Sequence, residues 1–426
     1  MKIFSKLYYE YRRIWKIIVL YLIISGPGIV VMVADNDAAG ITTYAATGAK
    51  FGYNLIWFLL FLVPIAYFVQ EMTVRLGVIT KRGHSESVFE AFGSFWGWFS
   101  LTNLMVVNWL TLITEFVGMT AALKLFGVPP YITVTGVCIL MGIMVLNGRY
   151  WTWEKIALAF CALNLIYIPC AFILNPPVST IFHDGFIPHF PNGFNNNVFF
   201  FLMANIGTTI APWMLYFQQS AVVDKGMKEK DIPWGKFDTM VGAILTIAVA
   251  VFIVIVTGTV LFISPNGIDI SSAAEAAQKL MGMNKYVGSF LAVGLFNAGL
   301  LGAICISLAS SWAFGEIFGW AHSLNNKIKE APWFYANYFI TLISAGLIVL
   351  IPKAPLVLIT LLVQVVSAML LPATLVFLLL LLNDKKSMGE YKNNLFQNIT
   401  GISIVALIII LSTLYAISVI FPNLFN

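Results

Sequence analysis

Charged residues are scarce in this chain. Asp, Glu, Lys and Arg make up 10% of its 426 residues, and hydrophobic residues make up 60%, whereas a typical soluble domain is about 25% charged. This balance excludes an ordinary soluble globular protein and indicates a protein that crosses a membrane many times, with lipid as a partner. The net charge of +5 implies no nucleic-acid partner, because basic residues in cytoplasmic loops are common in membrane proteins.

Cysteine and histidine are also rare, with four residues of each type. The cysteines fall in apolar segments without CxxC spacing, which argues against a disulfide framework or a zinc cluster. The histidines fall in connections or at helix ends, so we expect none inside the membrane core. Because no Ser/His/Asp, zinc or phosphate-loop pattern occurs at a workable spacing, we expect neither an enzyme nor a bound cofactor.

About eleven apolar segments are long enough to cross about 30 Å of hydrocarbon as helices. They cover residues 17–48, 54–78, 97–126, 131–147, 155–175, 198–220, 239–264, 285–318, 334–352, 355–383 and 398–421. The longest polar connections carry no hydrophobic pattern of their own. We therefore predict one transmembrane domain over residues 1–426.

Basic residues are distributed unevenly between the two sides of these segments. About 19 of the 24 lie in the N-terminal tail and the even-numbered connections, which predicts a cytoplasmic N-terminus in a bacterial inner or plasma membrane. The first five segments (about 17–175) and the next five (about 198–383) then cross in opposite directions. This arrangement suits inverted repeats, with the segment at about 398–421 appended.

Two aspartates, Asp35 and Asp37, lie in the middle of the first apolar segment, where a charge costs about 2.5 to 3.5 kcal/mol on insertion scales. Small residues and proline interrupt the sixth segment at residues 207–212. Paired broken helices in corresponding positions of two halves indicate the binding site of a transporter. The carboxylates in the first break indicate that the bound substrate is a cation.

The residues around these breaks resemble the natural resistance-associated macrophage protein (NRAMP) family of divalent-metal transporters, over most of the chain. The matching motifs are Gly26-Pro27-Gly28 ahead of Asp37, residues 48–57, Glu115-Phe116-Val117-Gly118, and Gln364-Val365-Val366-Ser367 followed by Pro372. The resemblance implies an all-α, leucine-transporter-type fold with 5+5 inverted repeats, broken helices 1 and 6, and about 11 transmembrane helices. It also implies a metal site between the two breaks and alternating access.

The chain departs from the family at several positions. The family's Asp-Pro-Gly-Asn falls on residues 37–40, which keep the aspartate but end in Gly40, and its Met-Pro-His falls on Ala211-Pro212-Trp213. Loss of a thioether weakens discrimination against hard ions, and Mg²⁺ gives up its waters reluctantly. The pattern resembles the NRAMP-related magnesium transporters. We therefore expect largely hydrated Mg²⁺ as the transported ion and Mn²⁺ as the second candidate.

The expected site combines ligands, residues that orient water and small residues that leave room for it. The metal-site residues are Asp37, Asp35, Thr208, Ala211, Gly40 and Gln364, and the pocket wall is Trp213 and Asn36. Asp37 is the central ligand, although it also suits an N-cap of the second half-helix. Trp213 equally suits a lipid-facing or core aromatic residue.

Proton coupling requires a titratable group near the ion. Trp213 stands at the family's histidine position, and Leu112 stands at the position of its third-helix aspartate. Glu115 and Glu316 remain as a residual proton path, so we expect weak or no proton coupling. The alternative is a transporter of a small organic substrate, such as an amino acid, on the same fold. The pair of acids in one break argues against an anionic substrate.

Overall fold

The structure is a computed structural model that describes residues 26–420, except 147–148, 189, 191–192, 194, 263–266, 353 and 355. Across this part of the chain the regular structure is helical. The predicted start of the first segment, at residue 17, lies outside the described residues, as does residue 421 at the end of the last one.

Helices long and apolar enough to cross a membrane account for most of the chain. Within the described residues nine stretches meet this criterion. They are formed by α4 (Ile56–Thr80), α6 (Ser94–Lys124), α8 to α9 (Tyr150–Leu163, η1 Asn164–Ile166 and Tyr167–Ile173), α11 with α12 (Asn196–Thr209 and Pro212–Asp224), η2 with α13 (Glu229–Asp231 and Ile232–Leu261), α15 (Lys285–Phe318), α16 (Pro332–Val349), α17 (Leu356–Asn383) and α19 (Leu395–Ile420).

Two further elements complete the set of predicted crossings. Helix α7 (Pro130–Leu146) has 17 residues, and the pair α2 (Pro27–Ala34) and α3 (Ala38–Phe51) forms the broken first crossing. Each of these helical stretches overlaps one of the segments expected from the sequence. Both predicted breaks are present, the first between α2 and α3 and the second between α11 and α12.

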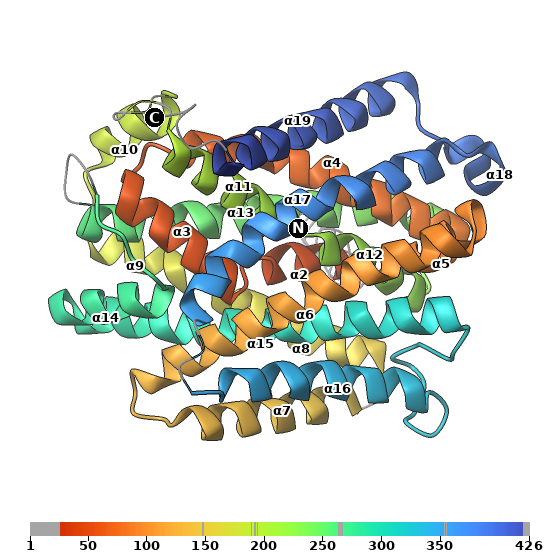
Figure 1. The fold of residues 1–426 in the computed structure, drawn as a ribbon, viewed down its shortest axis with the longest axis horizontal. Coiled ribbons are helices and arrows are strands. Elements are labelled where there is room, and N and C mark those ends of the chain that lie inside the picture. The colour runs from red at the N-terminus through yellow and green to blue at the C-terminus, as the bar shows by residue number, and fades with distance from the viewer. Residues whose placement is uncertain are drawn as a thin grey trace, which may run out of the picture.

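Short helices lie at the two ends of the bundle. Figure 1 places α10 (Val178–Phe186) and α14 (Ala273–Met283) at one end, and α5 (His84–Phe92) and α18 (Lys385–Met388, followed by η3 at Gly389–Tyr391) at the other. Helix α10 lies in the connection of residues 176–197, one of the longest polar connections of the chain. The two groups thus cover opposite ends of the long helices.

The broken helices lie in the middle of the bundle (Figure 1), and small residues bring their neighbours close. Helices α2 and α3 pack against α13, and α11 packs against α17. A Cβ at Gly207 would lie 1.9 Å from the carbonyl oxygen of Gln364, and one at Gly48 would lie 2.1 Å from the hydroxyl oxygen of Thr257. Glycine at these positions therefore permits the backbone approach that packs membrane helices tightly.

Candidate metal site

The first break is held open by two carboxylates that bind the start of α3. Asp37 has an extended backbone, and its Oδ1 accepts a hydrogen bond of 2.6 Å from the Gly40 amide, which makes Asp37 the N-cap of α3. Glu115 on α6 accepts a hydrogen bond of 2.9 Å from the Ala38 amide through Oε2. These bonds satisfy amides that a helix leaves unpaired at its N-terminus, so the break is a stable local structure.

Asp35 is the least satisfied polar residue of the break. Its side chain is 1% exposed, and neither carboxylate oxygen has a hydrogen-bond partner. Buried carboxylates are costly unless they are paired or bind a cation. Asn36, beside it, donates from Nδ2 to the carbonyl oxygen of Thr246 at 3.0 Å, and its Oδ1 has no partner. Both residues therefore leave oxygens available at the break.

The second break lies between Thr209, which ends α11, and Pro212, which begins α12. Proline suits the first helical position because its missing amide hydrogen has no acceptor there. The Ala211 amide donates to the Met214 sulfur at 3.3 Å. The break therefore contains a thioether, that of Met214, although Ala211 stands at the family's methionine position. The Met214 side chain folds back onto the backbone of Ala211. This contact was missed because Met214 resembles any other apolar residue of the helix.

The two breaks meet at Gly40. A Cβ at this position would lie 2.6 Å from Thr208 Oγ1, 2.9 Å from the carbonyl oxygen of Asp35 and 3.2 Å from Asp37 Oδ1. The Thr208 hydroxyl is buried and has no hydrogen-bond partner. Oxygens from both broken helices thus lie against a position that has no side chain, and the expected role of Gly40 in leaving room for water stays a prediction.

Helix α15 packs against the first break at Gly302. A Cβ at Gly302 would lie 2.8 Å from Asp37 Cβ and 3.0 Å from Glu115 Oε2. The carboxyl group of Glu115 therefore lies beside Asp37. Gly302 is a site residue that sequence reasoning missed, because one glycine among several in an apolar helix gives no signal of what it faces.

Gln364 and Trp213 are two further residues that the sequence predicted at the site. Gln364 is buried, its Nε2 has no partner, and its backbone carbonyl contacts Gly207 on α11. Trp213 is fully buried and packs edge-on against Phe217 at a centroid distance of 6.2 Å. Trp213 therefore belongs to an aromatic cluster beside the second break, and its role as a pocket wall stays a prediction.

The donor set limits the chemistry of the site. Among the described residues, no group of three or more His, Cys, Asp or Glu side chains is placed so that it could hold a metal ion. Apart from the Met214 sulfur, which accepts the Ala211 amide, the donor atoms at the breaks are carboxylate, carbonyl and hydroxyl oxygens. Such oxygens suit hard cations such as Mg²⁺, Ca²⁺ and Mn²⁺. An ion bound here would keep several of its water ligands.

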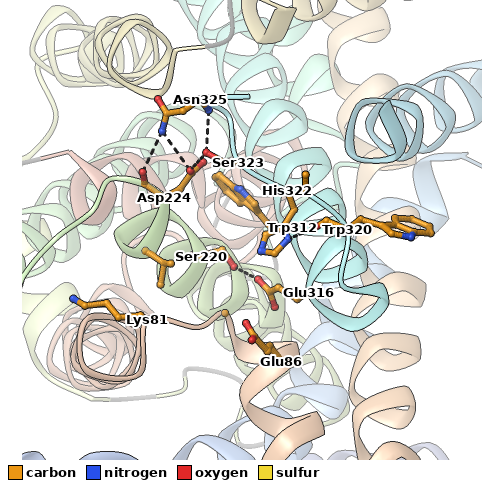
Figure 2. Close-up of a pocket in the computed structure, with 13 residues that line it drawn as sticks. Lys81, Glu86, Ser220, Asp224, Trp312, Glu316, Trp320, His322, Ser323 and Asn325 are labelled. Atoms are coloured by element: carbon orange, nitrogen blue, oxygen red, sulfur yellow. Dashed lines mark hydrogen bonds between the residues drawn. The ribbon is translucent and has the colours of Figure 1, made fainter. Parts of the chain in front are cut away.

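Glu316 lies in a different cavity, at the end of the bundle that carries α5. This cavity has a volume of about 290 Å³ and lies between the ends of α12 and α15, and Lys81 and Glu86 also line it (Figure 2). Glu316 accepts hydrogen bonds from Ser220 Oγ at 2.6 Å and from the Ser85 amide at 3.1 Å. It therefore has local partners of its own, and Glu115 is the expected proton-path residue that lies at the break.

Sequence relatives are named as metal transporters. The chain is 26% identical over 404 residues to the divalent metal cation transporter MntH of Caldanaerobacter subterraneus, covering 91% of each chain. It is 30% identical over 420 residues to the protein of the same name in Staphylococcus saprophyticus, covering 91% of this chain and 90% of the relative.

Solved structures share the fold. The manganese transporter of Eremococcus coleocola, in complex with an aromatic bis-isothiourea substituted compound, has a TM-score of 0.77 at 18% identity and covers 96% of this chain and 89% of its own. MhsT in complex with L-phenylalanine has a TM-score of 0.54 at 12% identity, covering 92% of this chain and 98% of its own. These similarities confirm the predicted leucine-transporter-type fold.

A family model described as natural resistance-associated macrophage protein-like matches residues 28–418. This range includes both breaks, Glu115 and Gln364. The relatives are transporters, which confirms the expectation that the chain is not an enzyme. The chain belongs to the Nramp family.

Proposed function

We propose that this chain moves a divalent metal ion across the membrane by alternating access, and that the ion is largely hydrated Mg²⁺, with Mn²⁺ as the second candidate. The observation that carries this proposal is the meeting of the two breaks at Gly40, where the backbone carbonyl of Asp35, Asp37 Oδ1 and the Thr208 hydroxyl lie around one position. The buried carboxylate oxygens of Asp35 in the same break have no hydrogen-bond partner. A dication with its water shell would satisfy these atoms. The relatives named as divalent metal cation transporters support the general activity.

The preference for Mg²⁺ follows from the ligands. Ala211 replaces a thioether, and the nearby Met214 sulfur already accepts the Ala211 amide. Without a free sulfur ligand, the site gains little for soft ions. Mg²⁺ is usually held by one or two carboxylates while it keeps several waters, and Asp35 and Asp37 supply carboxylates of this kind.

Transport in this proposal has weak or no proton coupling. Among the described residues near the breaks, Glu115 supplies a carboxyl group beside Asp37, and no histidine takes part. A dication would then follow the membrane potential, which contributes about 4.6 kcal/mol per 100 mV. In a bacterial inner or plasma membrane, which is negative on the cytoplasmic side, this potential favours inward movement of the ion.

Flux into proteoliposomes tests the proposal. We expect saturable uptake of Mg²⁺ and Mn²⁺, with little change in internal pH, and loss of both fluxes in Asp37→Ala. Asp269→Ala is the matched control, because this aspartate is 83% exposed and pairs with Lys50 on the surface. Unchanged Mg²⁺ flux in Asp37→Ala would contradict the proposed site.

A further inference from the structure

Tyr44 links the two broken helices through Thr209, the residue next to Thr208. It is a fully buried residue of α3, and its phenol oxygen lies 3.1 Å from the hydroxyl oxygen of Thr209, the last residue of α11. Thr209 follows Thr208, whose hydroxyl has no partner. No sequence motif singled out Tyr44, because an isolated tyrosine in an apolar helix is most often a core residue.

Helix geometry directs this phenol back towards the break. Tyr44 follows Asp37 by seven residues, which is close to two turns, so both residues lie on the same face of α3. Side chains in a helix lean towards its N-terminus, and the N-terminus of α3 is the break itself.

The chemistry of a phenol suits a water shell at this place. A tyrosine hydroxyl has one hydrogen to donate and can also accept. When it donates to Thr209, its oxygen remains free to accept a hydrogen bond from a water molecule that a metal ion polarises. The unpartnered oxygens of Asp35 can accept hydrogen bonds from other waters of the same shell.

We infer that Tyr44 is a specificity-determining residue that recognises the water shell of the transported ion, so that it favours ions that cross with their waters retained. This inference rests on the proposed function and adds a contact that discriminates between ions. Because Mg²⁺ gives up water more reluctantly than most ions, removal of the phenol oxygen affects Mg²⁺ more than Mn²⁺.

Tyr44→Phe tests this role in proteoliposomes made with the full chain. We expect the KM for Mg²⁺ to rise about fivefold, the effect of one net hydrogen bond, while the KM for Mn²⁺ changes by less than about twofold and maximal rates stay similar. Tyr53→Phe is the matched control, because it removes a phenol that contacts Thr259 at 2.9 Å outside the breaks. An equal rise for both ions in Tyr44→Phe, or no rise for either, would overturn the inference.

Thr209→Val separates recognition of water from simple bracing of the two helices. This variant removes the Tyr44–Thr209 bond but keeps the phenol oxygen. We expect Thr209→Val to change the ratio of the KM values for Mg²⁺ and Mn²⁺ less than Tyr44→Phe does. Equal changes of this ratio in both variants would mean that the Tyr44–Thr209 bond only stabilises the packing of the two helices. If Asp37→Ala abolishes flux but Tyr44→Phe leaves this ratio unchanged, the inference fails and the proposed function stands.

Discussion

Asp238 on α13 accepts a hydrogen bond of 2.8 Å from the backbone amide of Gly28, near the start of α2. The same oxygen accepts a bond of 3.0 Å from the Gly26 amide. A buried ion pair of 2.9 Å between Lys225 and Glu154 lies against this end, because a Cβ at Gly26 would come within 2.1 Å of Glu154 Oε1. The end of α2 far from the metal site is thus fastened to its neighbours.

This anchoring predicts that Asp238→Ala releases the start of α2. Charge-assisted hydrogen bonds contribute about 1.5 to 3 kcal/mol each, and the variant leaves two amides unpaired. We expect faster hydrogen–deuterium exchange in residues 27–34 and lower metal flux, because the state with α2 docked becomes less populated.

Asp384→Ala is the control for this experiment. Asp384 also accepts amide hydrogen bonds at a helix start, from Lys386 and Ser387, but it belongs to the short surface helix α18. Its removal should leave exchange in residues 27–34 unchanged. Equal exchange in wild type and Asp238→Ala would show that these bonds do not hold α2.

Gly40→Ala is expected to close the metal site. The added methyl group would lie 2.6 Å from Thr208 Oγ1 and 2.9 Å from the Asp35 carbonyl oxygen, so the two broken helices would have to move apart at the proposed site. Flux of Mg²⁺ should fall by at least about tenfold, since a shift of ligands by about 1 Å can cost that much or more. Gly136→Ala is the control, because a Cβ there meets no atom within 4 Å. Wild-type flux in a folded Gly40→Ala protein would place the ion elsewhere.

The breaks could be predicted from the sequence because their signals are local. Asp37 caps α3 through an amide three residues away, and Pro212 starts α12 at the position where proline is most tolerated. Charge, glycine and proline in an apolar segment therefore identify a broken helix without any knowledge of its neighbours.

The partners of the breaks depend on contacts that span the chain. Asp238 is 210 residues from Gly28, Tyr44 is 165 residues from Thr209, and Gly302 approaches Asp37 from another helix. Nothing near these residues in the sequence shows what they face. His84 illustrates the same limit, because a residue expected at a helix end is fully buried.

Glu115→Gln tests whether the residual carboxylate carries protons. The amide oxygen of glutamine can still accept the Ala38 amide, so α3 should remain capped while one negative charge beside Asp37 is lost. We expect apparent affinity for Mg²⁺ to fall by about tenfold, as charges a few Å apart interact strongly in a protein interior. Internal pH, followed with a trapped dye, should stay constant during flux in both proteins.

The matched control is Glu275→Gln, which changes a partly exposed glutamate that pairs with Lys279 away from the breaks. It should keep wild-type affinity for Mg²⁺. Acidification that accompanies metal uptake in the wild type and disappears in Glu115→Gln would identify Glu115 as a proton carrier and would contradict weak coupling.

The buried histidine His84 is expected to make the folded protein less stable in acid. Burial lowers the pKa of His84 from 6.5 to about 4, although its hydrogen bond of 3.0 Å with Gln219 acts in the opposite direction. Below pH 6.5 the unfolded chain binds a proton that the folded chain refuses, so stability falls as pH drops, by about 2 kcal/mol at pH 5. His84→Gln should narrow the difference between melting temperatures at pH 7.5 and pH 5, whereas His183→Gln, whose side chain is 75% exposed, should not. An identical difference in wild type and His84→Gln would show that this imidazole is protonated in the folded protein.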